Sequence, residues 1–458
     1  HHEHRRQRQM CIRDRITTNE NFEQQFSELL HWDMRADSAV DKRVAEIIAQ
    51  VRERGDAALL ELTNQLDRRE LETPEDFRFD SNALLEAWHR LQPRHQQALQ
   101  LAAERIRLFH QRQLDSSWSF EDELGNRLGQ RISSLERVGV YVPGGQAAYP
   151  STVLMTVIPA TVAGVEDIVV TVPTPDDSAN DMVLAALHLT GASQVFSVGG
   201  AQAIAAMAYG TETVPRVDKI VGPGGAYVAT AKKQVFGQVG IDMIAGPSEV
   251  LILADGTTPV DWAVLDLFSQ AEHDASAQSI LISPDRDYVA EVVARIEAML
   301  PTMERESIIR QSLRQRGAVI LCSNKQEALD LANRIAPEHL ELAVAAPEDW
   351  LNQIRHAGAI FCGAHTAETF GDYVAGPSHV LPTFGTARFA SPLGVYDFQK
   401  RTSVVEMSAR GASALAAVTD TLAQSEGLFA HAKAAALRSG ANEDAPISGA
   451  NTGKGKTE

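Results

Sequence analysis

Cysteine is scarce in this sequence, with three residues in a chain of 458. Cys11, Cys322 and Cys362 lie far apart, and none of them forms the Cys-x-x-Cys spacing that binds a metal or carries out thiol–disulfide exchange. This cysteine content is typical of a reduced, cytoplasmic protein, and we expect a cytoplasmic location.

Positive charge is also in short supply. Lysine and arginine together number 42 against 60 aspartates and glutamates, so the formal net charge is −18 at pH 7. A surface that binds nucleic acid or an anionic membrane needs clustered basic residues, which this chain spreads thinly. We therefore expect no nucleic-acid or membrane partner, and a small molecule as the substrate.

No apolar run is long enough to span a bilayer. The most apolar stretch, Val153–Val172, is interrupted by Pro159, Glu166 and Asp167, which predicts a buried helix followed by a strand. Residues 1–15 lack the apolar segment of a signal peptide, and we interpret them as a non-native or disordered leader outside the fold. Residues 439–458 contain little to bury and are predicted to form a disordered tail.

The apolar pattern predicts an α/β protein with two doubly wound, Rossmann-like sheets. Residues 20–112 are mostly helical in pattern, and after residue 138 short β-branched runs alternate with alanine-rich helical runs, which is typical of parallel sheets. Strands are expected in two sets, at 139–142, 168–172, 194–198 and 219–221, and at 250–253, 279–282, 318–321 and 359–362. Residues 409–437 are predicted to add helices without strands.

Glycine clusters follow three of the expected strands, at 143–145, 199–202 and 222–225. A turn into a helix at such a place lets backbone N–H groups approach a pyrophosphate. None of the clusters matches the Gly-x-Gly-x-x-Gly dinucleotide fingerprint, so plain tight turns explain them equally well.

Gln270 and His273 are three residues apart in a predicted helix, a spacing that points an amide oxygen and an imidazole the same way. A solvated helix face is the alternative. With an aspartate and a second histidine the pair would provide nitrogen and oxygen ligands suited to zinc. Asp372 is expected in a glycine-rich loop at the carboxyl-terminal edge of a sheet, where α/β proteins place their ligands. An ordinary turn aspartate is its alternative.

Glu338 and His339 stand at the start of an expected strand, Leu340–Val344. A neighbouring acid and imidazole can share proton transfer, although an incidental pair at the start of an element would have the same sequence. Ser248 lacks a Gly-x-Ser-x-Gly elbow, which excludes a serine hydrolase and favours a hydrogen-bonding role. His431, on a terminal helix, cannot be told by its spacing from a surface histidine.

Six motifs in a fixed order resemble the histidinol dehydrogenase family. They lie at 137–145 (RVGVYVPGG), 198–205 (VGGAQAIA), 244–249 (IAGPSE), 269–273 (SQAEH), 336–340 (APEHL) and 376–383 (GPSHVLPT). The resemblance extends from about residue 16 to residue 438 and therefore covers nearly the whole chain.

The resemblance implies an enzyme that oxidises L-histidinol to L-histidine through histidinaldehyde, the last step of histidine biosynthesis. It implies two NAD⁺ per turnover, one zinc ion per subunit and an intertwined homodimer. Zinc would be held by Gln270, His273, Asp372 and the partner subunit's His431. The substrate would contact these four ligands and Ser248, His339, His379 and Glu426.

The resemblance also implies the catalytic and cofactor residues. His339 would be the general base of each oxidation, and Glu338 would activate the water that hydrates the aldehyde. Tyr141, Gln202 and Gly225 match NAD-binding positions. Gly225 stands where the family usually has asparagine, so one amide contact to NAD is missing, which would cost about 0.5–1.5 kcal/mol of binding.

From the pattern and the resemblance together, we assign residues 16–140 and 250–390 to a first α/β domain with the metal and catalytic residues. Residues 141–249 are assigned to a second α/β domain on the NAD side, and 391–438 to a small C-terminal dimerisation piece. Two other activities are alternatives. One is a relative that oxidises another small polyol, such as a sulfopropanediol. The other is a zinc hydrolase, which the glycine clusters disfavour.

Overall fold

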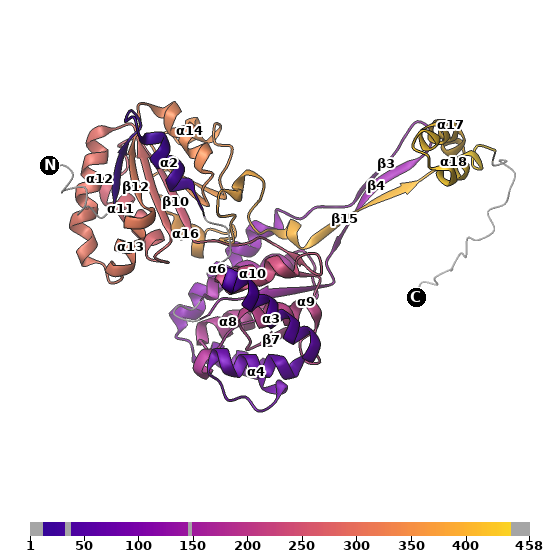
Figure 1. Ribbon diagram of the computed structural model, residues 1–458, viewed down its shortest axis with the longest axis horizontal. Coiled ribbons are helices and arrows are strands. Elements are labelled where there is room, and N and C mark those ends of the chain that lie inside the picture. Colours follow the sequence, from indigo (N-terminus) through magenta and orange to yellow (C-terminus); the bar gives the residue numbers. More distant parts are fainter. Residues whose placement is uncertain (1–11, 33–37, 145–148, 441–458) are drawn as a thin grey trace. The chain divides into compact units, whose positions relative to one another are not determined.

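The computed structural model describes residues 12–32, 38–144 and 149–440 (Figure 1). It forms two compact units, unit 1 from residues 1–114 and 134–398, and unit 2 from residues 115–133 and 399–458. Unit 1 contains two six-stranded sheets, and unit 2 contains a three-stranded sheet and helices. The expected leader residues 1–11 and tail residues 441–458 lie outside the described residues, as does Cys11.

The first sheet of unit 1 has the strand order β2-β7-β6-β5-β8-β9, and we call it the β5 sheet. All neighbours are parallel except the edge strand β2, which is antiparallel to β7. The strands are β2 (Arg78–Phe79), β5 (Arg137–Tyr141), β6 (Asp167–Thr171), β7 (Gln194–Phe196), β8 (Lys219–Val221) and β9 (Gly240–Ile241).

Helices cover both faces of the β5 sheet. One core joins α3 (Ser38–Arg54) and α4 (Asp56–Asp67) to α9 (Gly200–Tyr209) and α10 (Ala226–Val235). The other joins α5 (Ser81–Arg90) and α6 (Pro93–Gln111) to α7 (Pro150–Val162) and α8 (Asp181–Thr190). Residues 38–111 therefore pack on the NAD-side sheet. Their expected assignment to the first domain is corrected, because their apolar stripes are buried against α7–α10.

The second sheet of unit 1 has the order β1-β12-β11-β10-β13-β14, with every neighbour parallel, and we call it the β10 sheet. Its central strands are buried on both faces, which explains their nearly continuous apolar sequence. The strands are β1 (Arg13–Ile16), β10 (Glu249–Ala254), β11 (Gln278–Ser283), β12 (Ala318–Leu321), β13 (His339–Ala343) and β14 (Ala359–Cys362).

Two helical layers enclose the β10 sheet. The core on one face contains residues of α11 (Val260–Ala271), α12 (Arg286–Met299) and α13 (Glu306–Arg316). The core on the other face contains residues of α2 (Phe22–Leu30) and α14 (Lys325–Ile335). The strands expected in both sets are confirmed to within two residues at each end. The expectation of an α/β protein with parallel sheets is thus confirmed.

The edge strand β1 corrects the expected leader boundary. Arg13–Ile16 pairs in parallel with Ala318–Leu321, and the preceding Ile12 is only 2% exposed. Residues 12–15 therefore belong to the β10 sheet. The sequence does not reveal this strand, because one buried apolar residue, Ile12, and pairing through the backbone produce no periodic hydrophobic pattern.

Unit 2 is built around the strand order β15-β4-β3, with β3 (Trp118–Glu121) and β4 (Arg127–Ser134) forming an antiparallel hairpin. The third strand, β15 (Gln399–Glu406), precedes the helices α17 (Ala409–Ser425) and α18 (Phe429–Ala436), which pack against each other. The two helices were expected, whereas the three strands were not, because β3 and β15 are almost wholly exposed and β4 is at most half-buried, so none of them has a buried face.

Two further observations concern the described residues alone. No helix among them is long and apolar enough to cross a membrane. Cys322 is buried and Cys362 is exposed, and both are free thiols.

Candidate functional site

A cavity of about 760 Å³ lies inside unit 1. Part of its lining comes from the residues that follow β5 and β8, at the carboxyl-terminal edge of the β5 sheet. The rest includes Ser248, Glu338 and His339, at the starts of β10 and β13. Carboxyl-terminal strand ends of one sheet and amino-terminal strand ends of the other therefore share one cavity.

Gln270 and His273 both line this cavity. Gln270 lies in the last turn of α11, whereas the helix ends at Ala271 and His273 follows in a turn, its N–H bonded to the Gln270 carbonyl at 3.2 Å. The expected pairing on one helix is corrected in this detail. Both residues still line the same cavity, because the turn continues the path of the helix.

Glu368 holds the side chain of Gln270. The Gln270 amide nitrogen donates to the two carboxylate oxygens of Glu368 at 2.5 and 2.9 Å, and the amide oxygen accepts from the backbone N–H of Glu249 at 3.3 Å. Both Gln270 and Glu368 are fully buried. Sequence reasoning missed Glu368. Its position four residues before Asp372 on a helix, which puts two carboxylates on one face, was the available signal.

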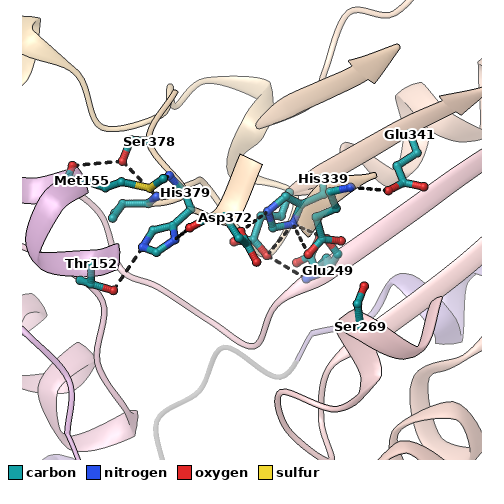
Figure 2. Close-up of polar contacts among 12 residues, drawn as sticks. Thr152, Met155, Glu249, Ser269, His339, Glu341, Asp372, Ser378 and His379 are labelled. Carbon is teal, nitrogen blue, oxygen red and sulfur yellow. Dashed lines mark hydrogen bonds and ion pairs between the residues drawn. The ribbon is translucent and has the colours of Figure 1, made fainter. Parts of the chain in front are cut away.

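Asp372 lies in α16 (Glu368–Tyr373), which corrects its expected place in a loop. Its Oδ1 is 3.8 Å from Nε2 of His339, the first residue of β13 (Figure 2). Asp372 therefore reaches the amino-terminal end of the strands, and the expected carboxyl-terminal edge is wrong. The reason is that α16 follows β14 and returns along the sheet, since the Glu368 N–H donates to Glu341 Oε1 in β13 at 2.7 Å.

The ring of His339 has a defined tautomer. Its Nδ1 lies 3.0 Å from the backbone carbonyl of Glu249, which can only accept, so Nδ1 carries the proton and Nε2 is left as the basic nitrogen (Figure 2). Burial lowers the pKa of His339 to about 3. The imidazole is therefore neutral at physiological pH, with its lone pair directed to the side of Asp372.

Glu338 is buried beside this imidazole. Its Oε2 accepts the backbone N–H of Glu249 at 2.8 Å and lies 3.6 Å from His339 Nδ1. Burial, with a further contribution from the Glu249 carboxylate, holds the pKa of Glu338 well above its ordinary value. A carboxylate with a raised pKa is a stronger base when it is ionised.

His379 uses both of its ring nitrogens in hydrogen bonds. Nδ1 lies 3.1 Å from the Asp372 carbonyl, and Nε2 lies 3.1 Å from Oγ1 of Thr152 in α7 (Figure 2). Burial lowers the pKa of His379 to about 4. The residue lines the cavity and joins α7, next to the β5 sheet, to the segment that carries Asp372.

The expected cofactor residues lie at the carboxyl-terminal edge of the β5 sheet, but only Gly225 lines the cavity. Tyr141, the last residue of β5, accepts the Gly200 N–H at 3.2 Å, and burial raises its pKa to about 12. Gln202 is 1% exposed, and its side-chain oxygen has no hydrogen-bond partner in the described structure. The structure thus groups Tyr141 and Gln202 around Gly200, and neither residue lines the cavity.

Glu426 and His431 belong to unit 2. Glu426 is the C-terminal cap residue of α17, His431 lies in α18, and both side chains are exposed. Their expected contacts with substrate and metal remain predictions.

The acidic character of the cavity fits a divalent metal ion. His339, Glu368 and Asp372 offer ligand atoms that all lie within 4.8 Å of one another. Burial raises the pKa of Asp372 to about 7 and holds that of Glu368 well above its ordinary value, the latter also through Asp372 and Glu341. A cation among these carboxylates would relieve both effects, and the imidazole, amide and carboxylate donors suit zinc.

Comparison with known proteins decides the family. The family model for histidinol dehydrogenase matches residues 32–439. Histidinol dehydrogenase of Chromobacterium violaceum is 57% identical over 418 residues, which cover 91% of this chain and 96% of the relative. That of Pseudomonas putida is 56% identical, over 91% of this chain and 95% of the relative.

The chain belongs to the histidinol dehydrogenase family.

A solved structure agrees with this assignment. Histidinol dehydrogenase from Elizabethkingia anophelis superposes with a TM-score of 0.88 at 32% identity, over 94% of this chain and 98% of that one. The resemblance inferred from the six motifs is confirmed, and the chain is an oxidoreductase of this family. Neither the polyol-specific relative nor the zinc hydrolase is favoured by these matches.

Proposed function

We propose that this chain oxidises L-histidinol to L-histidine in two NAD-linked steps through histidinaldehyde, as the last step of histidine biosynthesis. One observation carries the proposal. The cavity that contains Gly225 also contains Gln270, His273, Asp372 and the pair Glu338–His339. Hydride transfer needs direct contact between the reacting carbon and the nicotinamide, so both must fit one continuous space.

The topology supports a cofactor site on the β5 sheet. We infer that both sheets of unit 1 are Rossmann-like, because in each the strands that follow a central strand, β5 or β10, first extend the sheet on one side of it and then continue on its other side. In such sheets ligands bind outside the carboxyl-terminal strand ends at this reversal. For the β5 sheet these are the ends of β5 and β8, where the cavity opens.

Zinc would be held by Gln270, His273 and Asp372, with His431 of the partner subunit as the fourth protein ligand. When bound, it would polarise the alcohol oxygen and fix the imidazole and amino nitrogens of the substrate. Glu368 already orients the amide of Gln270, and the Glu249 N–H holds the amide oxygen. The protein thus supplies a preorganised ligand before metal binds.

His339 is the general base of the proposed reaction. The Glu249 carbonyl fixes the proton on Nδ1, so Nε2 is free to accept the hydroxyl proton as hydride leaves the same carbon. The desolvated ring is neutral, which is the state that a base requires. The same nitrogen would act on the aldehyde hydrate in the second oxidation.

Glu338 is proposed to activate the water that converts histidinaldehyde into its hydrate. The residue lines the cavity next to His339, and its raised pKa makes the ionised carboxylate a stronger base toward water. In each oxidation two electrons leave the substrate as hydride to NAD⁺ and one proton leaves through a protein base. Addition of water supplies the second oxygen of the carboxylate.

Substrate recognition is assigned to Ser248 and His379, which line the cavity, and to Glu426 from unit 2. Tyr141, Gln202 and Gly225 are proposed for NAD. Tyr141 and Gln202 do not line the cavity, and their contact with the cofactor remains a prediction.

A homodimer would explain unit 2. Apolar side chains on its helices are exposed, with Val418 at 58%, Leu422 at 59% and Phe429 at 65%. Such a surface on a small unit is typical of a protein interface, and a second copy would bury it while it supplies His431. The same proposal places the enzyme in the cytoplasm with its substrate.

The test is NADH formation by the purified, zinc-loaded protein, followed at 340 nm with L-histidinol. Formation of two NADH for each histidine produced supports the proposal. No increase with histidinol, or faster turnover of a sulfopropanediol, would contradict it. Saturable NAD⁺ binding would further separate it from a zinc hydrolase.

A further inference from the structure

Lys232 and Asp242 form an ion pair in the interior of unit 1, with side chains only 2% and 1% exposed. Lys232 lies in α10, and Asp242 follows β9 directly. Burial of two charges is costly, and it is offset only when the remaining hydrogen-bonding capacity is satisfied. Neither residue lines the cavity, and neither has a role in the chemistry above.

Both residues bind the backbone of one glycine. Lys232 Nζ donates to the carbonyl of Gly222 at 2.9 Å, and the N–H of Gly222 donates to Asp242 Oδ2 at 2.8 Å. The ion pair therefore holds both polar groups of this residue, whose peptides begin the loop between β8 and α10.

No residue other than glycine fits at position 222. Its φ is +111°, which other residues rarely adopt, and a Cβ there would lie 2.2 Å from the carbonyl oxygen of Tyr141. The loop therefore packs closely against Tyr141 at the end of β5, and the ion pair binds its first residue, Gly222.

The loop leads straight into the cavity. Pro223, Gly224 and Gly225 line it, and α10 begins at Ala226. The first N–H groups of a helix have no partner within the helix, and the glycines leave the backbone uncovered on the cavity side. The direction of these groups depends on where the peptides of Gly222 are fixed.

We propose that the Lys232–Asp242 pair is a positioning element for the dinucleotide cofactor, which fixes the Gly222 peptides so that the loop 222–225 presents its backbone to NAD. This rests on the proposed NAD-linked function. A buried ion pair is weak evidence for a role in stability, because apolar side chains of similar volume often replace one without loss. Retention of the charges is explained by the backbone groups that they hold.

The experiment compares the wild type with the double variant Lys232→Met/Asp242→Leu, which keeps the branching and approximate length of the side chains but binds neither polar group of Gly222. We expect Kd and KM for NAD⁺ to rise about 10- to 100-fold, as misplacement of a binding loop does. KM for histidinol, zinc content and kcat at saturating NAD⁺ should stay within about twofold, because the β10 sheet is untouched. If the ion pair only stabilised the fold, NAD⁺ affinity, KM for histidinol, zinc content and kcat would all change together.

Lys219→Met is the matched control. Lys219 pairs with Asp397 in the same unit but binds no part of the loop, so its loss should leave NAD⁺ affinity unchanged. If the double variant does not fold, Asp242→Asn decides, since its single side-chain oxygen can accept from Lys232 or from Gly222 but no longer from each through a separate oxygen. A rise of about threefold or more in Kd supports the proposal.

Unchanged NAD⁺ affinity in a folded variant overturns the positioning role. Absence of NAD⁺ binding in the wild type would instead overturn the proposed function, so the two failures are distinguishable.

Discussion

The amide nitrogen of Gln270 donates to both carboxylate oxygens of Glu368, at 2.5 and 2.9 Å, deep in the site of unit 1. An amide has one acceptor and one donor end, and a carboxylate accepts only. The contact therefore decides which end of Gln270 is available as a metal ligand.

Glu368→Ala is expected to weaken zinc binding by about 10- to 100-fold, as loss of a residue that orients a ligand does. Zinc affinity, measured by competition with a chelating dye, provides the readout. Glu368→Gln keeps an acceptor and should lose less. In a Gln270→Ala background the effect of Glu368→Ala should vanish. An equal loss in that background would show that Glu368 binds the metal directly.

Gly225→Asn should strengthen NAD⁺ binding. Gly225 precedes the first residue of α10 with φ −65°, and a Cβ there meets nothing within 4 Å. Asparagine is a good N-cap, and one regained hydrogen bond is worth about 0.5–1.5 kcal/mol, a several-fold fall in KM for NAD⁺. An increase in KM would show that the cavity needs the open space at this position.

Glu338→Gln should affect the two oxidations unequally. The amide cannot take a proton from water, so oxidation of histidinaldehyde should slow by about 10²–10⁴-fold, whereas histidinol oxidation to the aldehyde should change much less. Single-turnover assays that start from each compound measure the two steps. His339→Asn is the matched comparison, and it should slow both. If the two oxidations slowed equally in the Glu338→Gln variant, Glu338 would have no distinct role in hydration of the aldehyde.

The contribution of the Glu249 carboxyl to the stability of the metal-free protein should fall as pH rises from about 4.5 to about 7. Burial raises the pKa of Glu249 from 4.5 to about 7, so in this window the folded state binds more protons than the unfolded state. The contribution is fully present below the unfolded pKa and lost as pH passes the folded one. Glu249→Gln, which keeps an acceptor for the Phe384 N–H, should flatten this decline.

The measurement is Tm against pH for the two metal-free proteins. A partial slope should remain in the variant, because Glu338 and Glu368 also have raised pKa values. His339 and His379, whose pKa values are lowered to about 3 and about 4, contribute a slope of opposite sign in both proteins, so the difference between the two proteins is the test. Equal slopes in the wild type and the variant would contradict the assignment.

Mixed dimers test the predicted role of the partner subunit's His431. His431→Ala and Asp372→Ala should each be inactive alone. After unfolding and refolding together, random pairing creates one intact site in each hybrid dimer, or about a quarter of the wild-type activity. Refolding of each variant by itself is the control. If the mixture regained no activity, the two residues would not act together across the subunits, and the predicted role of the partner subunit's His431 would be wrong.

Sequence reasoning located the strands well because burial leaves a strong local pattern. The β-branched runs at β6 and β10 are almost wholly buried in the folded state, so their apolar residues indicate it directly. The exposed strands β3 and β15 leave no such record, and β1 pairs through its backbone. The sequence predicts α3 to α6 as helices but assigns them to the wrong sheet. An apolar stripe shows that one face of a helix is buried, but not which sheet that face packs against.

For the site, the sequence determined the chemical groups. The family resemblance implied Glu338, His339, Gln270, His273 and Asp372, and all five line one cavity. What only the tertiary structure decided is how these groups constrain one another. Glu368 orients Gln270, the Glu249 carbonyl sets the tautomer of His339, and α16 turns Asp372 back to the amino-terminal strand ends. Hydrogen-bond direction and desolvation depend on distances between residues far apart in the chain, which local spacing does not contain.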